Sequence, residues 1–217
     1  MFHVLTAAHN LWDPKLGPAK MAVLYLDDRV AQDGKPFNMC LTVAINADWI
    51  KRYSVENDFC MVAVEQPFNS GVRLLRCLPE PGPSCAENGM VLGFSYDLPF
   101  NAPSKHLIRC EGPVTYRESE AILIIEHRIN TVGGNSGSPL IVDDQFVGVH
   151  STFIRDQKIN MAAPVNRNGN SVEHFSGVLR YMRGQISKLP GEIEDLGRAT
   201  CVTAKVRMFG EGMTPSC

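Results

Sequence analysis

The 217-residue sequence lacks several features that would each assign it to a particular class of protein. Its net charge at pH 7 is only -2, so no charge excess points to nucleic acid or to an anionic membrane surface as a partner. No apolar run approaches the roughly 20 residues of a membrane-spanning helix. The opening "MFHVLTAAHN" has no basic stretch before an apolar segment, so no signal peptide is visible. With 44% apolar and 20% charged residues, the chain is expected to bury a sizeable core.

Metal and redox motifs are also missing, although the chain has seven cysteines. No Cys-x-x-Cys pair occurs, which argues against zinc ribbons and thioredoxin-like sites, and an odd number excludes complete internal pairing. Two readings stay open. Cys77 and Cys85 flank "LPEPGPS" and could close a loop, whereas Cys40, Cys60 and Cys110 lie in apolar runs that favour buried free thiols. No metal site and no cofactor are predicted.

Short apolar or alternating runs recur along the chain, separated by Gly, Pro, Asn and Asp, which is typical of antiparallel sandwiches and barrels. They are "FHVLTA", "MAVLYL", "MCLTVAI", "DFCMVAV", "MVLGFS", "HLIRCEGPVTY", "AILIIEHRI", "PLIVDDQFVGVHST" and "INMAAPV". The "DDQ" between "LIV" and "FVGVH" predicts a tight hairpin. One helix is predicted over 171–189, with Ser171 as its N-cap. Its apolar face comprises Val172, Phe175, Leu179, Met182 and Ile186. The tail, 191–217, is expected to be loosely packed.

The stretch "TVGGNSGSPL", residues 131–140, needs a chemical explanation. A P-loop requires Gly-Lys-Ser/Thr, and no lysine is present. The elbow of α/β-hydrolases requires Gly-x-Ser-x-Gly before a helix, whereas here Ser138 replaces the last glycine and a strand follows. The remaining interpretation is a nucleophile loop, in which the N–H groups of Gly134 and Ser136 hold an oxyanion. Gly133 and Gly137 would leave room for a substrate backbone.

A serine nucleophile requires a base and an acid that orients the base. "VLTAAHN" ends an apolar strand with small residues and then His9, and "ENDFCMVAV" places Asp58 at the start of a buried strand. Asp48 in "NADWI" is a rival acid, but it does not lead into such a strand. Each residue alone has an ordinary structural explanation. In the order His9, Asp58, Ser136 they predict a Ser-His-Asp triad.

These three motifs, in this order, resemble those of the chymotrypsin-like serine proteases, and most closely the V8-like glutamyl endopeptidase branch. The resemblance covers roughly residues 1–170. It implies an all-β fold of two antiparallel barrels, about 1–80 and 81–170, within a protease domain 1–190 that ends in the predicted helix. It also implies that peptides or proteins are the substrates, that no cofactor is needed, and that His9, Asp58 and Ser136 act as base, orienting acid and nucleophile.

The same resemblance implies that two strands of the first barrel are absent, because in the family two strands precede the one that leads to the histidine. The first barrel is therefore expected to be incomplete at its N-terminus. A preceding segment carrying a signal peptide would imply an extracellular protein. Asn135 stands where trypsin-type members carry the Asp of their activation switch, so that ion-pair switch is expected to be absent.

The resemblance further implies a pocket for the residue before the scissile bond. Thr131 and His150, in the "G-x-H" setting of "FVGVHSTF", match positions that bind an acidic side chain in V8-like members, and both can donate to a carboxylate. Asn130 lies at the expected pocket floor and is neutral. Ser151 is expected to hydrogen-bond Asp58, and the ring of Phe153 is expected to narrow the pocket. The implied preference is Glu, then Asp.

Two functions from different classes remain open at this stage. The first is a serine endopeptidase with the His9–Asp58–Ser136 triad. The second is a weakly active or inactive homologue that acts as a binding or structural protein. The sequence gives no expectation for the oligomeric state.

Overall fold

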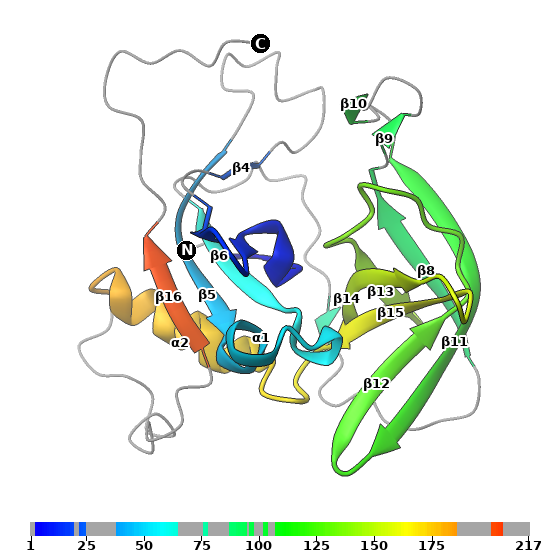
Figure 1. Ribbon diagram of the computed structural model, residues 1–217. Helices are drawn as coiled ribbons and strands as arrows, with labels where there is room; N and C mark the ends of the chain where they lie inside the picture. The colour runs from blue at the N-terminus through cyan, green and yellow to red at the C-terminus, as the bar shows by residue number, and fades with distance from the viewer. Residues whose placement is uncertain are drawn as a thin grey trace.

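The computed structural model describes residues 3–19, 22–24, 38–64, 76–77, 87–94, 96–97, 102–103, 107–185 and 201–205. These residues form a mostly antiparallel β-structure with two main sheets and one longer helix (Figure 1). The all-β, chymotrypsin-like fold expected from the sequence is confirmed. Within the described part of the chain, no helix has both the length and the apolar character needed to cross a bilayer.

The second main sheet closes into a six-stranded antiparallel barrel. Its strands are β8 (Glu87–Gly93), β11 (Ile108–Ser119), β12 (Ile122–His127), β13 (Pro139–Val142), β14 (Gln145–Ile154) and β15 (Ile159–Pro164). They follow the order β13-β8-β11-β12-β15-β14, and an additional β13–β14 pairing closes the ring. Alternate residues of β12 point inward and are buried, as a closed barrel requires. β7 (Arg76–Cys77) pairs in parallel with β14.

The first sheet has the order β1-β6-β5-β16, with β4 also pairing with β5. Its strands are β1 (His3–Thr6), β4 (Val23–Leu24), β5 (Asn38–Asn46), β6 (Cys60–Val64) and β16 (Cys201–Lys205). β16 pairs antiparallel with residues 42–46 of β5, a long-range pairing that the sequence did not predict. Two small sheets join β2 (Trp12–Asp13) to β3 (Gly17–Pro18) and β9 (Tyr96–Asp97) to β10 (Ala102–Pro103).

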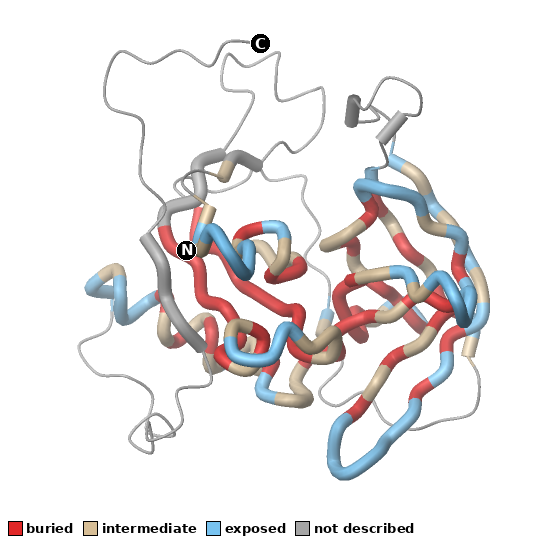
Figure 2. Tube along the Cα trace, in the orientation of Figure 1, coloured by how far each residue is buried: buried red, intermediate tan, exposed pale blue. Residues whose placement is uncertain are grey.

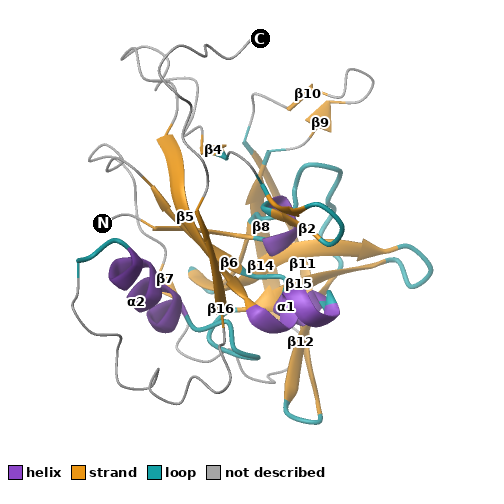
Figure 3. Ribbon diagram, turned by 60° about the vertical axis from the view of Figure 1, so that its left-hand side comes forward, coloured by secondary structure: helices purple, strands orange, loops and turns teal. Residues whose placement is uncertain are grey.

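Three short helical elements lie beside the first sheet; together with it they are called the first barrel below, although no strand pairing among the described residues closes it. They are η1 (Ala8–Asn10), α1 (Ala47–Arg52) and η3 (Val55–Asn57). In both Figures 1 and 3, α1 lies near the junction between the two main sheets. None of the three was predicted, because each is shorter than the two turns over which helical periodicity becomes visible.

The longer helix α2 (Val172–Met182) packs against the first sheet. Phe175 and Leu179 are fully buried, and the Phe175 ring meets that of Phe59 at a centroid distance of 5.6 Å. Figure 2 shows that buried residues run along β5 and β6 and through the second barrel, whereas the β11–β12 tip is exposed. The apolar face of α2 therefore closes the core of the first sheet.

Two local predictions are confirmed, and one needs correction. Asp143 and Asp144 form the hairpin turn with φ angles of 49° and 58°, values expected of a type I′ turn. The Ser171 side chain caps α2 by accepting from the N–H of His174. The helix nevertheless ends at Met182 and not at 189, and Gly184 follows with a left-handed φ of 67°. Met182 is 41% exposed, and Ile186 lies outside the described residues.

Cys77 and Cys110 are free thiols, and the buried thiol of Cys60 donates to the carbonyl of Ala7 at 3.5 Å. The alternative in which Cys77 is paired with Cys85 is therefore wrong, and Cys110 is a free thiol as expected. Cys85 lies outside the described residues, as does the side chain of Cys40.

Candidate active site

His9 lies in η1, directly after the end of β1. The chain leaves this strand through Ala7 and Ala8, both fully buried, and turns into η1. The small side chains let this turn pack closely against the sheet, so the imidazole stands at the edge of the core with about a third of its side-chain surface exposed. Part of the imidazole is therefore open to solvent.

Asp58 follows η3 and directly precedes the buried run of Phe59 and β6. It is completely buried, yet its carboxylate is well supplied with donors. Oδ1 accepts from the backbone N–H of His9 at 2.9 Å, and Oδ2 lies 2.5 Å from His9 Nδ1. The hydroxyl of Ser151 donates to the same Oδ2 at 2.5 Å. The rival acid Asp48 instead pairs with Arg52 on α1, at 3.7 Å.

Ser136 lies in the loop before β13, beside the same group of residues. Its hydroxyl donates to the carbonyl of Ser151 at 3.1 Å, and its own carbonyl accepts from Asn10 Nδ2 at 3.0 Å. Among the described residues, no hydrogen bond joins Ser136 Oγ to His9. Ser151 therefore links Asp58 to Ser136, while Asp58 itself bonds His9.

The turn from Val132 to Asn135 sets the direction of two backbone N–H groups. The N–H of Asn135 donates to the carbonyl of Val132 at 3.1 Å, and Gly134 has a φ of 95°. A positive φ at the third position makes this a type II turn, which only glycine adopts without strain. Within the described residues, the N–H groups of Gly134 and Ser136 have no backbone acceptor, whereas those of Asn135 and Gly137 do. Two neighbouring backbone donors are therefore left without a backbone acceptor.

Gly137 has a packing role that the sequence did not suggest. A Cβ atom at this position would lie 2.2 Å from Thr6 Oγ1 and 2.6 Å from Asn10 Nδ2. Gly137 thus allows the serine loop to pack against β1 and η1. A Cβ at Gly133 would meet nothing within 4 Å.

Asn135, whose Asp counterpart forms the ion-pair switch in trypsin-type relatives, is held by local hydrogen bonds. Its Oδ1 accepts from the N–H of Val132 at 2.8 Å, and its Nδ2 donates to the carbonyl of Phe94 at 3.3 Å. The side chain is buried. The neutral amide therefore fixes the turn without an ion pair.

His150, on β14, forms a buried pair with His127, on β12. His127 Nε2 lies 3.1 Å from His150 Nδ1, and both residues are almost fully buried. Burial lowers the pKa of His127 to about 3, with a smaller contribution from His150. Burial also lowers the pKa of His150 to about 4, and the charge of His9 adds to this effect while Asp58 opposes it. Both imidazoles are therefore neutral at pH 7.

The hydrogen-bonding of this pair fixes where its protons lie. His127 Nδ1 is buried and has no hydrogen-bond partner among the described residues. A buried N–H without an acceptor costs more free energy than a buried lone pair of an aromatic nitrogen, so the His127 proton belongs on Nε2. His127 then donates to His150 Nδ1, and the proton of His150 lies on Nε2. The partner on β12 thus makes His150 Nε2 a donor.

Thr131 is engaged differently from the prediction. Its hydroxyl donates to Asn160 Oδ1 at 2.7 Å, and Asn160 Nδ2 in turn donates to the carbonyl of Ile129 at 2.8 Å. Because a hydroxyl has a single proton, Thr131 would have to release Asn160 before donating to a substrate. Asn130 is exposed, and Phe153 is 52% exposed on β14.

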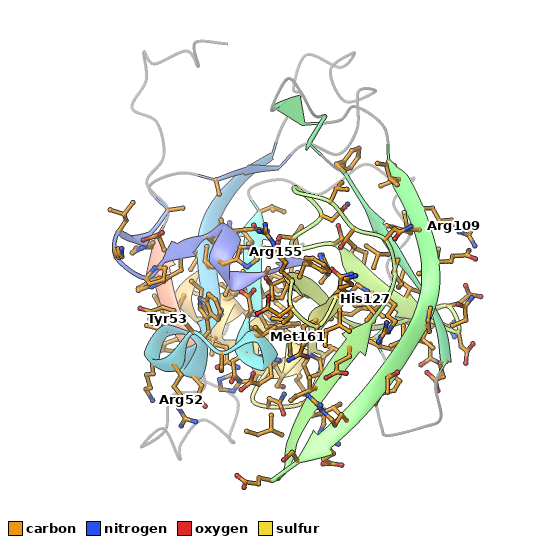
Figure 4. All side chains as sticks on the ribbon, turned by 45° about the vertical axis from the view of Figure 1, so that its right-hand side comes forward. Arg52, Tyr53, Arg109, His127, Arg155 and Met161 are labelled. Carbon is orange, nitrogen blue, oxygen red and sulfur yellow. The ribbon has the colours of Figure 1, made fainter. Side chains whose placement is uncertain are left out.

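The sequence reading missed His127 and Asn160. His127 occupies an inward position of β12, in step with Leu123 and Ile125, so a histidine in the apolar phase of an alternating strand was the available signal (Figure 4). Asn160 carried no such signal, because its hydrogen-bond partners, Thr131 and Ile129, lie 29 and 31 positions earlier in the sequence. In the described part of the chain, no group of three His, Cys, Asp or Glu side chains could hold a metal ion.

A β-fold with a closed second barrel, in which a buried Asp bonds a partly exposed His and a serine follows a type II turn, is that of the chymotrypsin-like serine proteases. The sequence model of the Trypsin family matches residues 2–170, and the chain belongs to this family. Comparison with curated protein sequences gives no match.

Solved structures of several proteases and protease homologues share the fold. A Glu endopeptidase has a TM-score of 0.59 at 18% identity, over 84% of this chain and 81% of its own. A mutant of human heparin binding protein has a TM-score of 0.60 at 18% identity, over 82% of each chain. An inactivated protease paralogue of the scabies mite has a TM-score of 0.59 at 15% identity, over 82% of this chain and 84% of its own. At these identities the similarity shows the fold and does not assign a branch of the family.

Proposed function

We propose that this chain is a serine endopeptidase that uses Ser136 as nucleophile, His9 as general base and Asp58 as the acid that orients the base. The observation that carries the proposal is the continuous set of contacts from Asp58 to His9 and, through Ser151, to Ser136. Asp58 accepts the Nδ1 proton of His9, so the lone pair of the imidazole lies on Nε2. That tautomer is the one able to take a proton from a hydroxyl.

The reaction then follows from these positions. Ser136 Oγ forms a bond to the carbonyl carbon of the scissile peptide, and its proton moves to His9 Nε2. The carbonyl oxygen becomes an oxyanion, which the N–H groups of Gly134 and Ser136 can stabilise. His9 returns the proton to the leaving nitrogen as the C–N bond breaks. Water then adds to the carbonyl carbon of the acyl-serine while His9 Nε2 takes its proton. His9 returns this proton to Ser136 Oγ as the bond between Oγ and the acyl carbon breaks.

Reaction with a fluorophosphonate probe tests the proposed nucleophile. We expect the folded chain to become covalently labelled, and Ser136→Ala to remain unlabelled, because the probe phosphorus reacts only with an activated hydroxyl. Labelling is measured by intact mass, and Ser119→Ala, an exposed serine on the β11–β12 hairpin, serves as the control. A folded chain that stays unlabelled would favour the second candidate, a homologue without catalysis. The Ser136 hydroxyl bonded to Ser151 is the observation that keeps this candidate open.

The preference for Glu, then Asp, before the scissile bond is also proposed. It is supported by His150, whose Nε2 proton is left free to donate once Nδ1 is bonded to His127. No charged Lys or Arg is available for this role on β14 between Gln145 and Ile154. Both imidazoles are neutral at pH 7, so His150 would bind the substrate carboxylate through a hydrogen bond from a neutral ring and not through a fixed positive charge.

A peptide library varied at the residue before the scissile bond tests this preference. We expect cleavage after Glu to exceed cleavage after Lys, Arg or large apolar residues by at least about tenfold, since a hydrogen bond to a charged group contributes about 1.5–3 kcal/mol. In His150→Ala the preference should disappear. Cleavage only after basic or large apolar residues, or an unchanged preference in His150→Ala, would contradict the assignment.

The pH dependence of the same assay gives a sharper result. A bound carboxylate stabilises the imidazolium form of His150 and so raises its pKa from about 4. The ratio of kcat/KM for Glu to that for Gln should therefore rise as pH falls from 8 to 6. The ratio cancels any effect of pH that the two substrates share. Three titratable groups act on His150: His127 contacts it directly, and His9 and Asp58 influence its pKa through their charges. A ratio that does not change with pH would contradict protonation of His150 in the complex.

A further inference from the structure

The loop between β15 and α2 is rich in asparagine, with the sequence "NRNGN" at 166–170. Figure 1 shows it, in yellow, crossing from the second barrel to α2. Asn168 fixes this loop to β12: the N–H of Leu123 donates to Asn168 Oδ1 at 3.0 Å, and Asn168 Nδ2 donates to the Leu123 carbonyl at 2.7 Å. Asn168 has a left-handed φ of 54°, which asparagine tolerates better than most residues. The loop is thus a fixed part of the second barrel.

Asn170 joins this loop to the first barrel. Its side chain is completely buried, and three of its hydrogen-bonding positions are used. Nδ2 donates to the carbonyls of Pro164 and Glu56, both at 2.9 Å, and Oδ1 accepts from Asn46 Nδ2 at 2.7 Å. Pro164 ends β15 in the second barrel, whereas Glu56 and Asn46 belong to the first. One amide therefore connects three backbone or side-chain groups across the barrel junction.

The first-barrel partners lie on both sides of Asp58. Glu56 is two residues before it, in η3, and the neighbouring Asn57 donates through Nδ2 to the carbonyl of Asn168 at 2.6 Å. Asn46 donates its backbone N–H to the carbonyl of Phe59, the residue after Asp58, at 3.2 Å. The backbone that carries the carboxylate is consequently held by the second barrel, from which Ser151 also reaches the carboxylate itself.

We propose that Asn170 is a positioning residue for the Asp58–His9 pair, a role that rests on the proposed function. It fixes the peptide segment before Asp58 relative to the barrel that carries Ser136 and Ser151. Loss of its three hydrogen bonds lets η3 shift, so that the 2.5 Å contact between Asp58 Oδ2 and His9 Nδ1 lengthens. Misplacement of such a group by about 1 Å is enough to cost on the order of 100-fold in rate.

The test compares Asn170→Ala with the unsubstituted chain in two measurements. The first is fluorophosphonate labelling, where we expect the maximal labelling rate to fall about 10-fold to 100-fold while the half-saturating probe concentration changes less than about twofold. The second is the proton NMR resonance of His9 Nδ1–H, which reports the hydrogen bond to Asp58 without any turnover. We expect this resonance to move upfield or to broaden beyond detection.

Ser171→Ala is the matched control, since it removes the N-cap of α2 from the adjacent position without removing a recorded contact with the first barrel. It should lower the melting temperature yet leave the labelling rate and the resonance unchanged. Asn57→Ala, which removes one inter-barrel bond, carries the test if Asn170→Ala does not fold. Equal labelling rates in Asn170→Ala and Ser171→Ala, or an unmoved resonance, would overturn the proposal. If the unsubstituted chain is not labelled, the proposed function fails, and the resonance alone decides the role of Asn170.

Discussion

Peptide hydrolysis is expected to fall by at least about 10⁴-fold in Ser136→Ala, to fall comparably in His9→Ala, and to fall no further when both are replaced. The reason is that the two groups act in one step: without the hydroxyl there is nothing for the base to deprotonate, and without the base the hydroxyl is a weak nucleophile. Multiplicative losses in the double variant would mean that Ser136 and His9 act separately.

The structure also indicates that Ser136→Ala should leave the fold intact. The side chain is half-buried and makes one recorded hydrogen bond, to the Ser151 carbonyl. The turn around it is fixed by backbone groups and by Asn135. The measurement is single-turnover cleavage of the best library peptide, with melting temperature as the control for folding. Full activity in a folded Ser136→Ala protein would show that the nucleophile has been assigned wrongly.

The sequence predicted the parts of the site that depend on local pattern. Small residues before His9, a buried run after Asp58 and glycines around Ser136 are each visible within ten residues, and their order along the chain supplied the rest. The hairpin at Asp143–Asp144 and the Ser171 cap are local for the same reason. Such features are determined by backbone preferences that neighbouring residues express on their own.

The contacts that the sequence did not predict are all long-range. Asn170 meets Asn46, 124 positions earlier, and His127 meets His150 across the second barrel. β16 pairs with β5, although nothing in the tail sequence identifies its partner. Gly137 was correctly selected as special, yet its packing partner Thr6 lies on another barrel. Pairings of this kind are determined by the tertiary fold, so residue type alone indicates a role without naming the contact.

Asp58→Asn is expected to lower kcat by about 10⁴-fold at neutral pH, with little change in KM, because the carboxylate contacts His9 and not a substrate. In the unsubstituted chain, Asp58 Oδ2 accepts from both His9 Nδ1 and Ser151 Oγ, and Oδ1 accepts from the His9 backbone N–H. An amide cannot satisfy all three donors. If its NH₂ replaces Oδ1, it faces the backbone N–H of His9. If its NH₂ replaces Oδ2, it forces His9 Nδ1 to accept, and the imidazole proton moves to Nε2.

The second arrangement keeps more of the hydrogen bonds and is the one expected. It leaves His9 Nε2 as a donor, so the base can no longer take the proton of Ser136. Asp48→Asn provides the matched control, since this carboxylate, 44% exposed, pairs with Arg52 and lies on α1. It should retain the activity of the unsubstituted chain. Steady-state kinetics on the same peptide distinguish the two acids: an Asp58→Asn enzyme within tenfold of full activity, or an Asp48→Asn enzyme equally impaired, would show that Asp58 does not orient the base.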